Sequence, residues 1–569
     1  MIQPNKKQKN GKAHDSVQTM GITAVHLALL ALSLFGLGYF FLSSSTFFAS
    51  DTGLRFLQIR ELLRQDWQSL SVGYPGQFLD PELRFIPYYY AYAVINNQIY
   101  LSISPFFPLL AAFFYDKLGA GGLPIAPTLG GLATAVGVYA LGQSQKVALG
   151  RLAMWTAVFA TPIVFYSVTL WDHTLASACA IWSLTGISYA WHKKAWWPVL
   201  VGGMAAGLGA GQRPEMYVFI LALSLSAIVV FWKQWTVLIS LGGGVLLSLT
   251  AVWWAQYRWY GHPLGMPTAL NLFGYGAVRY TAQSYSGVPI PQVSIAGKFL
   301  GLAESGNLLQ FGAFLLIILT VFLLALGLRN ERVNWVRAGL ACGVAGYSLC
   351  VFLGLQELMV GILPTFPLLA LSLSLDPQQA ADTKPINRLV LSVSLLFLGL
   401  MFAVWPAFGG LQWGARYLLA VYPLLLYLAF QNYSDFSRRP GFGLRKELRV
   451  TAVTLLTFSF LIQATGLFNL YQQHAEQIRV KSFLAQTTTP VIVTNSPFLP
   501  SEMSFINDKL FFYVADEADL EDLLLRLWQH EMTDFMFLPL AAETIPIPTH
   551  FTEFRVHQLD RNRYELVSP

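Results

Sequence analysis

The chain has 569 residues, of which 55% are hydrophobic and only 12% are charged, and its mean hydropathy is +0.50. Apolar runs of about 18 or more residues recur along most of it, and each is long enough to cross a hydrocarbon core about 30 Å thick. This composition excludes a soluble globule and predicts a polytopic α-helical membrane protein.

The N-terminal segment 1–21 is basic and precedes an apolar stretch at 22–43. That stretch is longer than the hydrophobic region of a signal peptide and lacks a small-residue cleavage site, so it predicts a retained first span. Later apolar stretches bring the number of spans to about 13. The predicted spans are 22–43, 123–144, 152–170, 174–191, 197–212, 214–232, 235–256, 307–328, 335–354, 359–375, 388–406, 413–431 and 450–469.

The apolar stretch Ser104–Leu118 is short and contains Pro105 and Pro108, which favours an interfacial or re-entrant helix over a span. If it does not span, all the later basic loops lie on the side of the N-terminus. The positive-inside rule then places that side in the cytoplasm. The predicted location of the protein is the plasma (inner) membrane. The basic residues of these loops are Lys146, Arg151, Lys193, Lys194, Lys233, Arg329, Arg332, Arg337, Lys384, Arg388 and the run from Arg438 to Arg449.

The formal net charge of +6 is explained by these loops, and no clustered basic patch indicates a nucleic-acid partner. The three cysteines, Cys179, Cys342 and Cys350, lie in apolar segments without ligand spacing. They predict core packing, and neither a disulfide framework nor a metal site.

This topology leaves a long first loop at 44–122, another loop at 257–306 and a tail at 471–569 outside the cytoplasm. In the first loop, the aromatic cluster Pro87–Tyr92 is of a kind that suits the headgroup zone. The tail alternates strand-like and helical patterns, which predicts a small extracytoplasmic α/β domain behind the transmembrane module 22–470. Its predicted elements are a strand at Val491–Val493, a helix at Asp519–His530 and a second strand at Phe535–Leu540.

Four charged residues, Asp51, Asp172, Arg213 and Arg416, fall at the outer ends of predicted spans. Three of them have a structural explanation: Asp172 as a helix cap, Arg213 as a partner of Glu215, and Arg416 as a snorkelling side chain. Charges at the edge of a helix bundle are costly unless they are paired or line a wet cavity. Their convergence on one face therefore favours an active site.

The order of several motifs resembles the membrane glycosyltransferases of the GT-C superfamily, in the branch of the protein O-mannosyltransferases and the lipid A aminoarabinose transferase. The resemblance covers roughly residues 20–470 and leaves the tail unmatched. The motifs are Ser50-Asp51-Thr52-Gly53, Asn96-Asn97-Gln98-Ile99-Tyr100, Ser104-Pro105-Phe106-Phe107-Pro108-Leu109-Leu110 with Gly119, Asp172-His173-Thr174-Leu175, Arg213-Pro214-Glu215, and Arg416-Tyr417-Leu418-Leu419 before Tyr422-Pro423.

The resemblance implies a polyprenyl-phosphate sugar as donor and an extracytoplasmic glycolipid, glycan or protein as acceptor, with transfer of a hexosyl or pentosyl group by inverting displacement. Arginine suits the donor phosphate because its fork binds phosphate oxygens bidentately, which assigns Arg213 and Arg416 to that role. Asp51 is the predicted general base, and Asp172 orients the acceptor or shares the role of base. The remaining candidates for substrate binding are Arg55, His173, Glu215 and Tyr417.

No cofactor is predicted. Acids beside a phosphate are compatible with a divalent metal, but no ligand spacing in the sequence predicts one. Two other classes of function remain open from the residues alone: a non-catalytic assembly protein or a polysaccharide ligase or polymerase, and a transporter or flippase of lipid-linked sugars. A ligase typically concentrates its function in a large late loop, whereas the first loop is the richest here. A transporter favours internal repeats and helices broken near the midplane, whereas these charges lie at outer helix ends.

Overall fold

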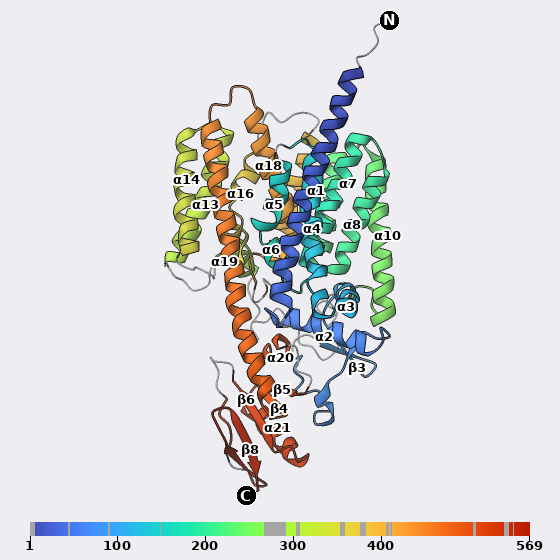
Figure 1. Cartoon of the computed structure of the whole chain (residues 1–569), viewed down its shortest axis with the longest axis vertical. Helices are drawn as coiled ribbons and strands as arrows, with labels where there is room; N and C mark the ends of the chain where they lie inside the picture. Colours follow the sequence, from blue (N-terminus) through green and yellow to red (C-terminus); the bar gives the residue numbers. More distant parts are fainter. Residues whose placement is uncertain are drawn as a thin grey trace.

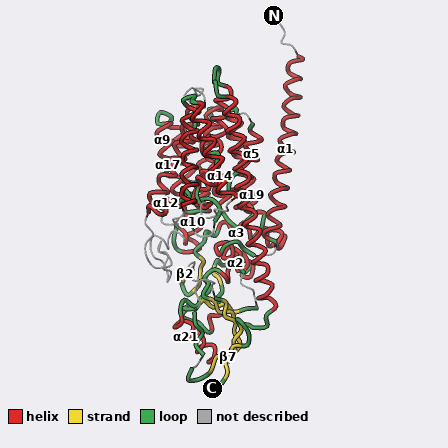
Figure 2. The backbone as a smooth tube through the Cα atoms, turned by 90° about the vertical axis from the view of Figure 1, so that its left-hand side faces the viewer, coloured by secondary structure: helices red, strands yellow, loops and turns green. Residues whose placement is uncertain are grey.

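The computed structural model describes most of the chain, and its described residues are 6–43, 46–88, 92–147, 149–266, 292–302, 308–352, 359–375, 383–405, 409, 412–503, 508–539, 545–549 and 551–568. Figure 1 shows a bundle of long helices with a smaller domain at one end, and the two ends of the chain lie at opposite ends of the molecule. The strands lie in the lower part of the molecule, below the helices of the bundle (Figure 2).

Helices of the bundle run along the long axis of the molecule (Figure 1). Their bounds are α1 Lys6–Leu42, α4 Ile125–Ser144, α5 Gly150–Phe159, α6 Ile163–Ser167, α7 His173–Lys193, α8 Trp197–Gln212, α9 Glu215–Phe231, α10 Trp235–Tyr260, α12 Gln292–Leu300, α13 Leu308–Arg329, α14 Val333–Phe352, α15 Ile362–Thr365, α16 Leu369–Leu373, α17 Lys384–Val404, α18 Tyr422–Arg438 and α19 Arg445–Gln486.

The chain is an integral membrane protein, and 7 of its described helices are long and apolar enough to cross a bilayer. Each predicted span coincides with one helix or with a broken pair. The span predicted at 152–170 is broken into α5 and α6 at Pro162, and the one at 359–375 is broken into α15 and α16 near Pro364 and Pro367. Proline removes a backbone donor and ends a helix, which explains both breaks.

The first loop forms a compact layer at the lower end of the bundle in Figure 1. Its sheet has the order β1-β3-β2 with antiparallel pairing. Asn96 and Asn97 form the two-residue turn between β2 and β3, and both have positive φ (50° and 63°), as such hairpin turns require. The elements are α2 Ser50–Arg64, β1 Ser71–Val72, η1 Pro75–Phe78, β2 Tyr92–Ile95, β3 Gln98–Leu101, α3 Phe106–Leu118 and η2 Gly119–Gly122.

The 13 residues of α3 are too few to cross a bilayer, and this helix packs against α2 at the end of the bundle. The aromatic cluster of this loop differs from the expectation. Tyr88 and Tyr92 are buried in the core of the first loop, and the Tyr88 hydroxyl donates to the Gly73 carbonyl over 2.6 Å. The loop needs its own core to fold, so these rings are not available to the headgroup zone; the residues 89–91 lie outside the described part of the chain.

The C-terminal domain is a five-stranded sheet with the order β5-β4-β6-β8-β7. The strand β4 lies next to the edge strand β5 and pairs in parallel with β5 and β6, and all four of its residues are buried. The predicted first strand, helix and second strand correspond to β4, α21 and β6. The elements are β4 Val491–Thr494, α20 Leu499–Glu502, β5 Leu510–Tyr513, α21 Glu517–Gln529, β6 Asp534–Leu538, β7 Arg555–Gln558 and β8 Arg563–Val567.

The first loop and the C-terminal domain share one hydrophobic core, although about 400 residues separate them in sequence. Leu57 and Phe85 of the loop belong to the same cluster as Val493 and Leu524 of the domain. The Tyr513 amide donates to the Phe85 carbonyl over 2.9 Å, which ties the edge strand β5 to the loop. The domain is therefore docked on the loop and does not hang freely from α19.

The connections at the opposite end of the bundle carry the basic residues identified in the sequence. The Arg438 guanidinium donates to the Lys146 carbonyl over 2.9 Å, and Arg337 pairs with Glu447 at 3.2 Å. Arg439 pairs with Glu331 at 3.0 Å. Three of the basic loops therefore meet at the end of the bundle opposite the C-terminal domain.

Candidate active site

The four charged residues singled out in the sequence meet where the bundle joins the first loop. Asp51 lies in the first turn of α2, and Asp172 immediately precedes α7. Arg213 follows α8, and Arg416 begins the 3₁₀ helix η4 Arg416–Val421. The fold thus gathers helix ends from distant parts of the sequence at one place.

Local sequence explains how Arg213 comes to lie there. Pro214 follows it, and the residue before a proline is driven into extended conformation. Arg213 accordingly has φ −144° and ψ 134°, which ends α8, and α9 starts directly after the proline. The side chain of Arg213 therefore projects from a break between two helices and not from a helix flank.

Asp51 and Arg416 form the most accessible ion pair of this group. Arg416 Nη1 donates to Asp51 Oδ2 over 3.1 Å, with the side chains 9% and 29% exposed. Burial raises the pKa of Asp51, but Arg416, Arg55 and Arg213 nearby lower it more, so the pKa of this carboxyl lies below its ordinary value. Asp51 is therefore a carboxylate at neutral pH, partly open to solvent.

Asp172 is fully buried between two arginines. Arg55 Nη2 donates to its Oδ2 over 2.9 Å, and Arg213 Nη1 donates to its Oδ1 over 3.3 Å. Arg55 also donates to the Asp51 carbonyl over 2.7 Å from one helical turn away. Although Asp172 occupies the N-cap position of α7, its side chain makes no capping hydrogen bond. Asp172 thus holds arginines and does not cap the helix.

Glu215 and His173 complete the group from its buried side. Arg213 Nε donates to Glu215 Oε1 over 2.9 Å, so the sequence-based pairing of these two residues is present together with the bond to Asp172. His173 Nδ1 lies 3.6 Å from the same Glu215 oxygen, and both side chains are almost fully buried. We call Asp51, Arg55, Asp172, Arg213, Glu215 and Arg416 the buried ion cluster; it has three acids and three arginines.

Two aromatic rings hold the guanidinium of Arg416. Its carbon lies 5.3 Å from the ring centre of Trp171 and 5.0 Å from that of Tyr417, both within range of a cation–π contact. Arg416 Nη2 also donates to the Tyr417 hydroxyl over 3.2 Å, and Arg213 lies 5.6 Å from the same ring. Arg416 is only 8% exposed overall, so it does not snorkel into solvent.

Several buried polar atoms of this group have no hydrogen-bond partner among the described residues. They include Nε of Arg55 and Nε of Arg416, which are strong donors. A buried donor without a partner costs about 1–3 kcal/mol, and more if charged, so such atoms are candidate positions for contact with a ligand or water. The other unpartnered atoms are Trp171 Nε1, His173 Nε2 and Glu215 Oε2.

Gly409 is a residue of this site that the sequence analysis missed. It has φ +96°, and a β-carbon there would lie 2.8 Å from Arg416 Nε and 2.7 Å from the side-chain oxygen of Gln412. Glycine is required for both reasons, because other residues avoid this φ and have no room. The Gly409-Gly410 pair in the sequence is the one signal that could have drawn attention to it.

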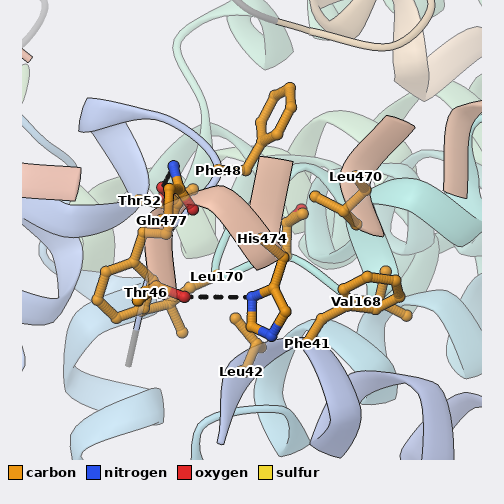
Figure 3. A pocket seen from close by; sticks show the side chains of 12 residues that line it. Phe41, Leu42, Thr46, Phe48, Thr52, Val168, Leu170, Leu470, His474 and Gln477 are labelled. Atoms are coloured by element: carbon orange, nitrogen blue, oxygen red, sulfur yellow. Dashed lines mark hydrogen bonds between the residues drawn. The ribbon is translucent and has the colours of Figure 1, made fainter. Parts of the chain in front are cut away.

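A small pocket lies behind the start of α2 (Figure 3). Its walls come from the end of α1, the segment before α2, the residues before Asp172 and the outer part of α19. Within it, Thr46 Oγ1 and His474 Nδ1 are 3.1 Å apart. The described residues contain no group of three or more His, Cys, Asp or Glu side chains placed to hold a metal ion.

Comparison with protein-family models finds no match, and neither does comparison with the sequences of curated proteins. Solved structures do match. The chain is similar to ArnT from Cupriavidus metallidurans in the apo state, with 13% identity, a TM-score of 0.50, and 96% of this chain and 98% of that chain covered. ArnT bound to undecaprenyl phosphate matches with 12% identity, a TM-score of 0.50, and coverage of 95% and 97%.

A weaker likeness, with a TM-score of 0.42, is found to the oligosaccharyltransferase of Archaeoglobus fulgidus in the apo form, at 11% identity over 90% of this chain and 69% of that one. ArnT, the lipid A aminoarabinose transferase, is a member of the GT-C superfamily. The resemblance to this superfamily is therefore confirmed at the level of the fold, over nearly the full length of both chains and including the C-terminal domain.

Proposed function

We propose that this protein is a glycosyltransferase that moves a sugar from a polyprenyl-phosphate donor to an extracytoplasmic acceptor by inverting displacement. The observation that carries the proposal is the buried ion cluster, in which a partly exposed carboxylate lies against an arginine with an unpartnered Nε donor. A site for a phosphate-linked substrate needs such a base and such a cation side by side. The GT-C-like fold, and a neighbour solved with undecaprenyl phosphate, support the same donor class.

Arg416 and Arg213 bind the donor phosphate in this proposal. Their side chains are 9% and 10% exposed, so neither is sealed completely from solvent. A guanidinium keeps its charge and binds phosphate oxygens through two parallel hydrogen bonds. As the sugar leaves, the phosphate gains a negative charge, and these arginines stabilise it.

Asp51 acts as the general base. It removes the proton of the acceptor hydroxyl or amine while that oxygen or nitrogen attacks the anomeric carbon. The bond from the anomeric carbon to the phosphate oxygen breaks, and its electron pair leaves with the polyprenyl phosphate. Protonation of Asp51 releases Arg416 from its ion pair at the moment when the phosphate gains charge, so the two events support each other.

The other members of the cluster position these groups. The two carboxylate oxygens of Asp172 accept from Arg55 and Arg213, and one carboxylate oxygen of Glu215 accepts from Arg213. Neither side chain is therefore placed to take a proton from an acceptor. His173 supports Glu215, and Tyr417 supports Arg416. We assign them to fixing the two phosphate-binding guanidiniums, within the tolerance of about 0.5 Å that catalysis requires.

The proposed site lies at headgroup depth on the outer side of the membrane. On α10, the exposed rings of Trp235 and of Trp254 and Tyr257 are about 30 Å apart along the helix, which matches the two aromatic belts of a bilayer. The end of α10 at Tyr260 packs on Tyr100 of the first loop at 5.6 Å. With the basic connections in the cytoplasm and 13 crossings, we expect the C-terminal domain and the site to lie outside.

Labelling of single cysteines tests this orientation. In a variant without Cys179, Cys342 and Cys350, a cysteine at Gly73 should react with an impermeant maleimide on intact cells. A cysteine at Gly441 should react only after the membrane is opened. Both positions are exposed, so accessibility within the protein is matched. Equal labelling of the two on intact cells would contradict the 13-span topology.

The function is tested by reconstituting the purified protein in lipid vesicles with radiolabelled polyprenyl-phosphate sugars. The acceptor pool is a cell-envelope extract from cells lacking the protein. Transfer of label into a glycolipid, glycan or protein that appears with the wild type and not with Asp51→Asn supports the proposal. Label that stays on the polyprenyl phosphate with every donor, or that merely crosses the bilayer, would instead indicate a transporter.

A further inference from the structure

The segment directly before Asp51 is held by the outer part of α19. Gln477 Nε2 donates to the Phe47 carbonyl over 2.6 Å, and Gln473 Nε2 donates to the Phe48 carbonyl over 3.0 Å. Figure 3 shows Gln477 and His474 reaching from α19 toward the chain that leads into α2. Two successive backbone carbonyls within four residues of Asp51 are therefore fixed by a helix more than 420 residues away in sequence.

The same segment is held from another direction by α20 of the C-terminal domain. The Phe47 amide donates to the Glu502 carbonyl over 3.3 Å. Gly53, two residues after Asp51, lies against the backbone of Ser501 so closely that a β-carbon would overlap the Ser501 carbonyl. Backbone touches backbone here, so no side-chain adjustment relieves the overlap.

Both holding elements are themselves anchored in the C-terminal domain. Met503, which follows α20, and Leu484 near the end of α19 belong to one small core with Ile492 of β4 and Met536 of β6. The local bonds at the start of α2 join only its own residues: the Ala49 amide donates to Thr52 Oγ1 over 3.3 Å, and Thr52 Oγ1 donates to the Ala49 carbonyl over 2.5 Å. They shape the first turn but do not fix its place against the rest of the protein. The position of the first turn, which contains Asp51, is therefore set from outside the helix.

We propose that the outer part of α19 and the helix α20 are positioning elements of the active site, and that Gln473, Gln477 and the Gly53–Ser501 contact set the place of the Asp51 carboxylate relative to Arg416. The C-terminal domain then belongs to the catalytic machinery in addition to any part it plays in acceptor binding. This inference rests on the proposed role of Asp51 as the base.

A variant of Gln477 tests the inference with a matched control. Gln477→Leu removes the donor to the Phe47 carbonyl at similar volume, and we expect kcat to fall about 10- to 100-fold with little change in the KM for the donor lipid. Gln472→Leu is the control, because Gln472 lies on the same helix and is exposed. Equal kcat values for the two variants would overturn the inference.

A double-mutant cycle separates positioning from general destabilisation. If Gln477 acts through Asp51, Gln477→Leu should cause no further loss in the Asp51→Asn background, where the base is already gone. If it merely loosens the protein, the same fold loss should recur in that background, and the inference fails. Residual transfer by Asp51→Asn is measured over long reaction times to make the comparison.

Gly53→Ala provides a second, independent variant. It should lower kcat at least as much as Gln477→Leu, because the added methyl overlaps a carbonyl. Gly242→Ala is its control, since Gly242 is also helical but has open space around it. Full transfer by Gly53→Ala would overturn the inference. Full transfer by Asp51→Asn would contradict the proposed base itself, whereas a loss in Asp51→Asn without one in Gln477→Leu contradicts only the positioning.

Discussion

Two networks of arginines and carboxylates in this protein differ in burial. The buried ion cluster has side chains that are mostly 10% exposed or less, with Asp51 at 29%. The second network joins the first loop to the C-terminal domain, where Arg84 pairs with Asp519 at 2.7 Å and with Asp522 at 2.8 Å. Arg84 is 42% exposed, and Arg526 of the same network also pairs with Glu82, which is 72% exposed.

From the difference in burial we infer that the exposed network serves stability and the buried ion cluster serves function. Exposed pairs gain about 0 to 1 kcal/mol each and serve to align surfaces whose hydrophobic core already holds them together. Buried ions lose several kcal/mol of hydration each, so hydrophobic residues of similar volume are often as stable or more stable in their place. A six-residue cluster at helix ends is therefore better explained by the ligand it binds than by the fold it supports.

The largest expected effect tests the catalytic member of the buried ion cluster. Asp51→Asn should lower turnover by about 10²- to 10⁴-fold, because the amide cannot accept the acceptor proton. The amount of folded protein in the membrane and the binding of donor lipid should stay near wild type. Asp66→Asn, in the exposed turn after α2, is the control. Transfer near wild type in Asp51→Asn would remove Asp51 from the mechanism.

The next effect concerns stability and contrasts the two networks directly. Asp172→Ala leaves Arg55 and Arg213 buried without their shared partner, and should destabilise the protein by about 3–5 kcal/mol. Asp519→Ala removes one partner of a half-exposed arginine and should cost about 1 kcal/mol or less. Thermal unfolding in detergent measures both. Equal losses would mean that burial does not distinguish the networks.

A smaller effect distinguishes bidentate binding of phosphate by a guanidinium from the mere presence of a positive charge. Arg416→Lys and Arg213→Lys keep the charge but lose the planar fork, and transfer should fall about 10-fold or more through weaker donor binding or turnover. Arg84→Lys in the exposed network should leave transfer unchanged. If neither the Lys variants nor the matching Ala variants alter transfer, the donor phosphate binds elsewhere in the protein.

The smallest effect is the pH dependence of the proposed base. The three arginines hold the pKa of Asp51 below its ordinary value of 3.8, so the carboxylate persists down to lower pH than in an isolated aspartate. We therefore expect kcat/KM to show no acidic limb from Asp51 at any pH above about 4. Replacing Arg55 by Met removes one of these charges and should raise the pH at which kcat/KM begins to fall through protonation of Asp51. An acidic limb near pH 6 in the wild type would point to another base.

The membrane character, the position of the long helices and the elements of the tail could all be predicted because they depend on local patterns. A run of apolar residues predicts a span wherever it occurs, and Pro214 predicts the break that frees Arg213. The burial of Tyr88 and Tyr92 could not be predicted. An aromatic cluster has the same composition at a headgroup as in a core, and only the packing partners distinguish the two.

The sequence by itself determined which residues carry charge at the helix ends away from the basic loops, because charge is rare in this chain. The tertiary structure alone decided their partners: that Asp172 faces Arg55 and Arg213, that Gly409 lies on Arg416, and that α19 and α20 hold the segment before Asp51. Such contacts join residues hundreds of positions apart. They arise from how whole helices pack, and no local pattern encodes that packing.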